Sequence, residues 1–160
     1  LSAQSLAYVR LMQDYPVVPI LDIWADTGTG SFTDPKIYVV QTNMTNSRLT
    51  DPEVLEFRYP VRLESYEIRA GSGGAGRWHG GNGGTRRVRF LEAMTASILA
   101  NNRSIAPFGM AGGQPGEAGR NWVERTDGRI EEMGHIGSVE MNPGDVYVIQ
   151  TPGGGGYGAG

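Results

Sequence analysis

The 160-residue sequence contains no cysteine, and Lys36 is its only lysine. Without cysteine the chain has neither disulfides nor thiolate metal sites, and a cytoplasmic location fits best because nothing requires an oxidising compartment. The scarcity of lysine and the formal net charge of -3 argue against a nucleic-acid partner, since phosphate backbones are bound through positive charge.

Long apolar segments and phosphate-binding motifs are missing as well. No apolar run approaches the ~20 residues that a membrane-spanning helix needs, and the first residues lack the basic-then-apolar order of a signal peptide. No G-x-x-x-x-G-K-[ST] motif is present, which excludes the chemistry of a P-loop. We therefore expect a soluble protein that has no membrane partner and binds no nucleotide through a P-loop.

Glycine, in contrast, is abundant. The chain has 25 glycines, about twice the usual ~7%, and most of them lie in the segments 71–84, 109–119 and 153–160. The segments between these clusters alternate apolar and polar residues, so the glycines indicate tight backbone paths between strands rather than a flexible polymer.

The remaining sequence predicts many short strands. Alternation with a period of two and turn signals such as Asp127-Gly128 and Asn142-Pro143-Gly144-Asp145 indicate hairpins. The apolar spacing within 2–13 predicts a short helix, and Thr50 or Asp51 is expected to cap a second helix that ends before Pro60. Strands are predicted near 37–41, 61–68, 88–90, 94–98, 121–125, 129–132, 139–141 and 146–150.

This pattern predicts a mainly β protein. We expect an antiparallel sandwich or barrel-like sheet of about seven or eight short strands, with one or two short N-terminal helices, because a parallel sheet would need intervening helices. On the strand near 88, the alternation predicts that Arg87 and Arg89 share a solvated or interfacial face opposite the apolar residues.

The glycine-rich segments contain the candidate site residues. Gly71 to Gly76 formally match G-x-G-x-x-G, but the glycines that follow are incompatible with the helix of a dinucleotide site, so a backbone-packing or substrate-adjacent loop is expected. His135 is expected to be structural, because no metal-type spacing links it to the other histidine. The substrate-adjacent or interface candidates are Arg77, His79, Asn82, Gly153, Gly154, Gly155, Gly156 and Tyr157.

Four stretches, in this order, carry a family resemblance: MTNSRLTDPEVLEFRYPV at 44–61, RAGSGGAGRWHGGNGG at 69–84, PFGMAGGQPGEAGRN at 107–121 and NPGDVYVIQTPGGGGYG at 142–158. Together they strongly resemble the C-terminal region of hydantoinase B and 5-oxoprolinase proteins, with the first stretch closer to the 5-oxoprolinase branch. The resemblance assigns 44–160 to a family-like C-terminal β domain. It leaves 1–43, with the expected helix and strand, as an unrecognised N-terminal segment.

The resemblance implies ATP-dependent opening of the lactam of 5-oxoproline or of a hydantoin. A hydantoinase A-like half would phosphorylate the amide oxygen, which supplies a leaving group, and the hydantoinase B half would complete ring opening. ATP and Mg are therefore expected in the partner half, with no cofactor or metal in this chain. The expected partners are the hydantoinase A-like half and the remainder of hydantoinase B, with a homo-oligomer as an alternative.

Catalytic residues are not identifiable from the sequence. It has no G-x-S-x-G motif, and Ser72 and Ser104 have no base at a meaningful spacing. We therefore expect a fragment or domain that is inactive alone. The alternatives are a non-catalytic β-rich assembly module and a fragment of a carboxylase-branch, acetone-type subunit.

Overall fold

The computed structural model describes residues 50–160, together with the backbone of residues 5–12, 18–19 and 23–25. The N-terminal elements are β1 (Ser5–Met12), β2 (Val18–Pro19) and β3 (Ile23–Ala25). They are followed by α1 (Pro52–Arg58), β4 (Val61–Arg69), β5 (Gly83–Phe90), β6 (Met94–Leu99), β7 (Arg120–Glu124), β8 (Ile130–Met133), β9 (Ile136–Met141) and β10 (Val146–Gln150).

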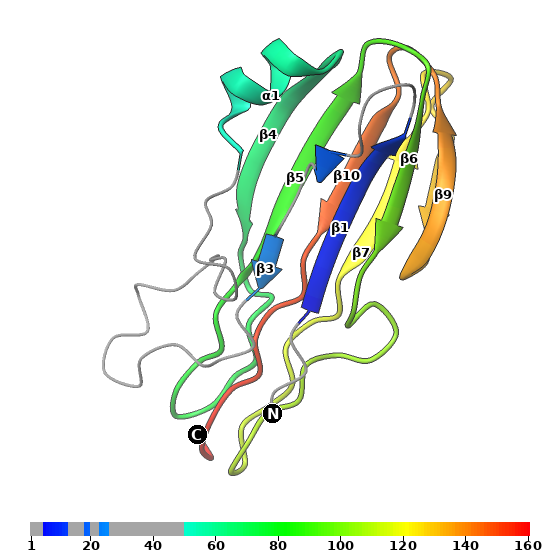
Figure 1. The fold of residues 1–160 in the computed structure, drawn as a ribbon. Coiled ribbons are helices and arrows are strands. Elements are labelled where there is room, and N and C mark those ends of the chain that lie inside the picture. The colour runs from blue at the N-terminus through cyan, green and yellow to red at the C-terminus, as the bar shows by residue number, and fades with distance from the viewer. Residues whose placement is uncertain (1–4, 13–17, 20–22, 26–49) are drawn as a thin grey trace.

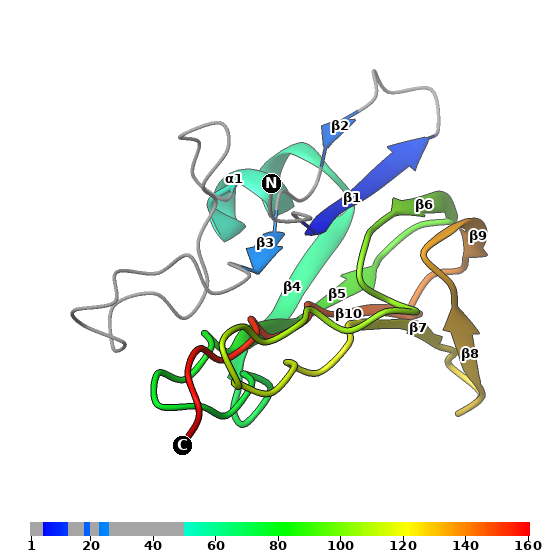
Figure 2. The ribbon, with the colours of Figure 1, turned by 90° about the horizontal axis from the view of Figure 1, so that it is seen from below.

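The strands form two antiparallel sheets. One has the order β4-β5-β10-β7-β8, and the other has the order β2-β1-β6-β9 with β3 paired to β1 (Figure 1). The view along the strands in Figure 2 shows the two layers facing each other. Residues 50–160 contribute seven strands and no closed barrel, so the predicted antiparallel sandwich is confirmed.

The hydrophobic core lies between the sheets, because alternate residues of each strand point inward. β5 contributes Val88 and Phe90, and β6 contributes Met94, Ala96 and Ile98. Apolar burial of this kind contributes about 25 cal/mol per Å². The other buried members of the core are Leu55, Val61, Ala100, Val123, Val139, Met141, Tyr147 and Ile149.

Helix α1 confirms the prediction for the segment that begins at Thr50. Asp51, rather than Thr50, is the N-cap, and its carboxylate accepts a hydrogen bond from the Glu53 amide at 2.9 Å. The helix ends at Arg58, and its C-cap Tyr59 has extended backbone angles, as expected for a residue before Pro60. Its one buried side chain, Leu55, packs into the core beside β4.

The prediction of a helix at 2–13 is wrong, since residues 5–12 form strand β1. β1 pairs in antiparallel register with β6, from Tyr8↔Leu99 to Met12↔Thr95. The edge of β6 that does not face β9 needs hydrogen-bond partners, and this tertiary pairing outweighs the helical spacing of the apolar residues. The strand predicted at 37–41 lies outside the described residues.

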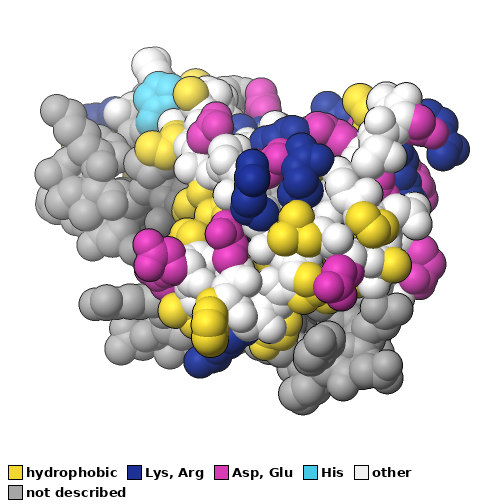
Figure 3. Space-filling model, turned by 90° about the horizontal axis from the view of Figure 1, so that it is seen from above, with side chains coloured by type: hydrophobic (Ala, Val, Ile, Leu, Met, Phe, Trp, Pro, Cys, Tyr) yellow, Lys and Arg dark blue, Asp and Glu magenta, His cyan; other side chains and the backbone are white. Residues whose placement is uncertain are grey.

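The outer face of β5 is charged, as the alternation predicted. Arg87 makes a bidentate pair with Glu124 of β7, at 2.7 and 2.6 Å, and Arg89 pairs with Glu64 of β4. Figure 3 views the molecule from above, at one end of the sandwich, and there too basic and acidic side chains lie next to one another. This mixture of signs does not form the uniformly basic surface that nucleic acid requires.

Candidate functional site: the glycine lobe

Three loops meet at one end of the sandwich. They are residues 71–82 between β4 and β5, residues 107–119 before β7, and residues 151–160 after β10, and together we call them the glycine lobe. The antiparallel registers Arg69↔Gly83, Gln150↔Thr85 and Gln150↔Arg120 bring the three to the same end. In Figure 1 they extend below the sheets.

The loops are joined by main-chain hydrogen bonds. The Gly74 amide donates to the Gly154 carbonyl, and the Gly154 amide donates to the Gly81 carbonyl, each at 2.8 Å. The Gly156 amide donates to the carbonyl of Gln114 in the third loop at 2.9 Å. The glycine lobe is therefore held by ordered backbone contacts, in agreement with the tight paths that its composition predicted.

The closeness of these backbones requires glycine. A Cβ on Gly153 would lie 1.8 Å from the Ser72 carbonyl oxygen, and one on Gly155 would lie 1.9 Å from the Phe108 carbonyl oxygen. A Cβ on Gly156 would lie 2.2 Å from the Ala75 carbonyl oxygen. Because each obstacle is backbone, no side-chain rotation can relieve the clash.

Short polar side chains tie the base of the lobe to the sheet. The buried Ser72 hydroxyl donates to the Arg69 carbonyl at 2.7 Å and accepts from the Gly83 amide at 2.8 Å. The Thr151 hydroxyl accepts from the Gly84 amide at 2.7 Å. These bonds satisfy backbone groups where the sheet ladder ends.

Arg69, the last residue of β4, connects the loops 107–119 and 151–160. Its Nη1 donates to the Ala118 carbonyl at 2.8 Å and to the Thr151 carbonyl at 3.1 Å, while its Nη2 pairs with Glu117 at 2.6 Å. Burial lowers the pKa of Arg69, an effect that Glu117 opposes. Arg69 is thus a structural brace rather than a free cation.

The predicted site residues are divided between the interior and the surface of the lobe. Gly153, Gly154 and Gly156 are buried and Gly155 is partly buried. Asn82 is partly buried, and its side-chain oxygen accepts from the Gly73 amide at 3.1 Å. Arg77, His79 and Tyr157 are exposed.

The exposed end of the lobe is apolar. Trp78 and Tyr157 form an antiparallel bridge, and the Arg77 guanidinium lies 5.9 Å from the centre of the Trp78 ring. Phe108 and Met110 are also exposed, and Met110 bridges to Tyr157. We call Trp78, Phe108, Met110 and Tyr157 the tip surface.

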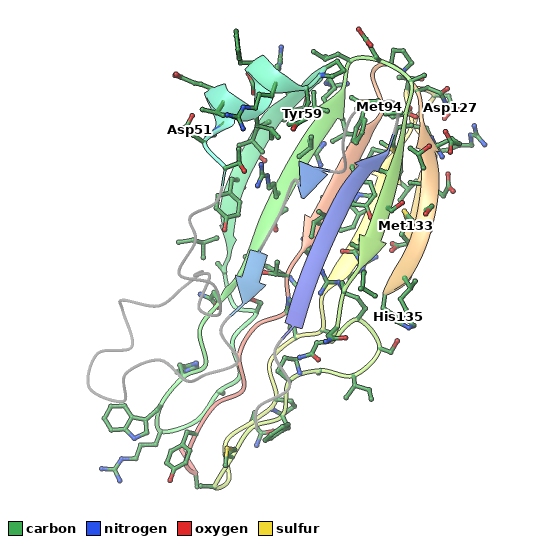
Figure 4. All side chains as sticks on the ribbon, in the orientation of Figure 1. Asp51, Tyr59, Met94, Asp127, Met133 and His135 are labelled. Carbon is green, nitrogen blue, oxygen red and sulfur yellow. The ribbon has the colours of Figure 1, made fainter. Side chains whose placement is uncertain are left out.

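The two histidines are not brought together into one site. His79 belongs to the lobe, whereas His135 lies at the lower end of β9 (Figure 4), where its carbonyl accepts from the Ala100 amide at 2.7 Å. Within the described part of the chain, no three His, Cys, Asp or Glu side chains are grouped as metal ligands. The lobe offers shape, backbone groups and an apolar surface, rather than a set of proton-transfer residues.

Sequence reasoning missed one set of polar residues at the inner face of the sheet: the buried Arg86, Asn121 and Tyr147, and the partly buried Arg103, which donates to Asn121. The signal for Arg86 was present, because the period of two places it on the same face as Val88 and Phe90. Arg103 comes from the loop after β6, where no periodic pattern indicated its direction.

A sequence model of the hydantoinase B/oxoprolinase family matches residues 22–160. The chain belongs to this family. The match includes part of the segment 1–43, in which no family motif was recognised. The hydantoinase B/oxoprolinase chain is 52% identical over 107 residues to a 5-oxoprolinase of Saccharomyces cerevisiae and 43% identical over 119 residues to one of Dictyostelium discoideum.

These matches cover 66% and 74% of the chain, but only 8% and 9% of the two relatives, so the chain spans about a tenth of the length of these curated relatives. Among solved structures, the family fold resembles an ATP-dependent caprolactamase from Pseudomonas jessenii, with a TM-score of 0.67 and 23% identity over 99% of this chain and 29% of that one. A nucleotide-free acetone carboxylase is similar over 70% of this chain and 19% of that one, with a TM-score of 0.59 and 21% identity. In the described part of this family member, no helix has the length and apolar character to cross a membrane.

Proposed function

We propose that this chain is the structural and interface-forming part of an ATP-dependent 5-oxoprolinase-type hydrolase that opens a lactam ring, and that it has no turnover alone. The observation that carries the proposal is the glycine lobe, an ordered structure whose exposed end is apolar and whose interior is almost entirely backbone. Such a lobe is suited to holding a rigid surface against another domain or subunit.

The 5-oxoproline substrate is supported by the relatives. The sequence is 43% and 52% identical to proteins named 5-oxoprolinase, whereas the caprolactamase and acetone carboxylase structures are 23% and 21% identical. We therefore favour the 5-oxoproline lactam over a hydantoin or a ketone. The alternative is a fragment of an acetone-type carboxylase subunit. An assay of substrate range would distinguish it from a 5-oxoprolinase-type fragment.

The proposed reaction needs components outside the described residues. An amide is a weak electrophile, so phosphorylation of its oxygen by a hydantoinase A-like half would supply the leaving group for attack by water. ATP and Mg are assigned to that half, and the remainder of hydantoinase B would complete ring opening. A cytoplasmic location belongs to the same proposal, because the chain has no cysteine.

The tip surface is proposed to contact the remaining part of the larger protein. The relatives are about ten times longer than their match to this chain, so most of such a polypeptide is available to cover these side chains. Arg77, His79 and Tyr157 are proposed to lie at or beside that contact. The buried Gly153, Gly154, Gly155 and Gly156, with Asn82, would hold it in place.

The test is a chimera. The matched region of the Saccharomyces cerevisiae 5-oxoprolinase is replaced by residues 44–160 of this chain, and glutamate and phosphate release from 5-oxoproline and ATP is measured. We expect activity from the chimera and none from the purified chain. Turnover by the purified chain alone, or a correctly folded chimera without activity, would contradict the proposal.

A further inference from the structure

Arg86 is a buried cation on the inner face of the sheet. It retains 2% of its exposure and lies on β5 opposite Tyr66 of β4 and Ile149 of β10. Burial lowers the pKa of Arg86 to about 10, although Tyr66 opposes the shift. The side chain therefore carries its charge at neutral pH inside a mainly apolar layer.

One edge of this guanidinium has no acceptor. Among the described residues, neither the Nε nor the Nη2 of Arg86 has a hydrogen-bond partner. These two nitrogens form the edge of arginine that binds a carboxylate side-on. Arg125 illustrates this use, because its Nε and Nη2 both donate to Glu131 Oε2, at 3.1 and 2.5 Å.

A second donor on the same face also lacks an acceptor. The hydroxyl of Tyr147 is buried and has no partner within the described part of the chain. Tyr147 lies opposite Val88, and Arg86 lies opposite Ile149, two pairs further along the strands, so Tyr147 and Arg86 share the inner face. Burial raises the pKa of Tyr147, which keeps its hydroxyl protonated and able to donate.

Arg103 provides the contrast. It is partly buried, and burial lowers its pKa to about 10. Its Nε and Nη2, however, both donate to Asn121 Oδ1, at 3.2 and 3.1 Å, and its Nη1 donates to the Asn101 carbonyl at 2.9 Å. The corresponding edge of Arg103 is thus occupied, and that of Arg86 is open.

We propose that the Nε–Nη2 edge of Arg86 is the binding site of a carboxylate on the inner face of the β4-β5-β10-β7-β8 sheet. An unpaired buried charge is strongly unfavourable, so proteins pair such groups or bind an ion to them. One carboxylate balances one guanidinium, and its two oxygens match the two open donors. The site lies outside the glycine lobe and does not depend on the proposed function.

The carboxylate has two sources that experiment can separate. One is an aspartate of the segment 1–49, whose acidic residues are Asp14, Asp22, Asp26 and Asp34. The other is a small carboxylate bound from solution. Both would use the same chemistry at Arg86.

The test measures the melting temperature of the whole 160-residue chain and its Arg86→Met variant, in chloride and in sodium acetate at equal ionic strength. Arg103→Met is the control, because the same edge of Arg103 already donates to Asn121. Asparagine variants of the four aspartates are measured singly and combined with Arg86→Met. The Hε–Nε resonance of Arg86 in the unmutated chain gives a readout that does not depend on a variant folding.

If the site binds a carboxylate from solution, acetate will raise the melting temperature saturably and shift the Arg86 resonance. The Arg86→Met variant will then lose this rise in melting temperature, and the Arg103→Met variant will keep it. An internal carboxylate predicts that Arg86→Met and one aspartate variant each lower the melting temperature by about 10 °C, with little further loss in the double variant. If acetate moves neither readout and no aspartate variant couples to Arg86→Met, the proposal is wrong.

Discussion

The backbone of Gly153 passes so close to Ser72 that a Cβ on Gly153 would lie 1.8 Å from the Ser72 carbonyl oxygen. Ser72 is itself fixed by hydrogen bonds to Arg69 and Gly83, so it cannot move away without breaking the base of the lobe. The contact joins residues that are distant in sequence, and it makes the last loop an integral part of the fold.

Gly153→Ala is therefore expected to destabilise the chain by about 3 kcal/mol or more, because overpacking against backbone cannot be relieved by a rotamer change. Urea unfolding of the purified chain measures the change. The control is Gly134→Ala, where the nearest atom to the added methyl group would lie 4.0 Å away. Equal stability of the two variants would show that the lobe is not packed as described.

At Gly128, the energetic cost of backbone conformation can be measured separately from that of steric overlap. Gly128 has φ of +86° in the β7–β8 turn, and no atom lies within 4 Å of the place a Cβ would occupy. Gly128→Ala should cost about 1 kcal/mol from left-handed strain alone, whereas Gly128→Asn should cost less because asparagine adopts this conformation more readily. Thermal unfolding of both variants measures the two losses of stability. A purely steric effect would instead make the larger asparagine the more destabilising of the two.

Asp145 links the β9–β10 turn to the β7–β8 hairpin. Its Oδ2 accepts from Arg125 Nη1 at 2.8 Å and from the Asn142 amide at 2.9 Å, and its Oδ1 accepts from the Thr126 amide at 3.1 Å. Burial alone would raise the pKa of Asp145, but the hydrogen bonds from Asn142 and Arg125 outweigh it and hold the pKa below its ordinary value of 3.8.

Asp145→Asn should therefore cost about 3 kcal/mol at pH 7, because it breaks a largely buried ion pair. A folded-state pKa below the unfolded value means that this stability is fully present above pH ~3.8 and is lost as the pH falls through the folded pKa. Urea unfolding at a series of pH values should show the two proteins converging in acid. The exposed Asp127→Asn is the control, since its surface pair with Arg129 contributes little. A difference that stays constant down to pH 2 would contradict this assignment.

The sequence predicted strands well where one face meets the core. The period of two located β5, β6, β7 and β9, in which alternate side chains are buried, and the Asp127-Gly128 turn followed from backbone preference. The strand at 5–12 was not predictable, because its state depends on pairing with β6. The glycine clusters indicated close packing, but not that Gly153 faces Ser72, since that contact is set by the meeting of loops from different strands.

The tip surface should matter for assembly rather than for folding. Phe108 is 64% exposed, so Phe108→Ser removes little packing and is expected to change the stability of the isolated chain by less than about 0.5 kcal/mol. In the chimera with the yeast 5-oxoprolinase, the same change would place a hydroxyl in an apolar contact and should lower glutamate release several-fold. Phe57→Ser is the matched control, because Phe57 is 91% exposed on α1, at the end of the sandwich opposite the lobe. Equal activity of the two chimeric variants would show that the exposed end of the lobe is not the contact with the rest of the enzyme.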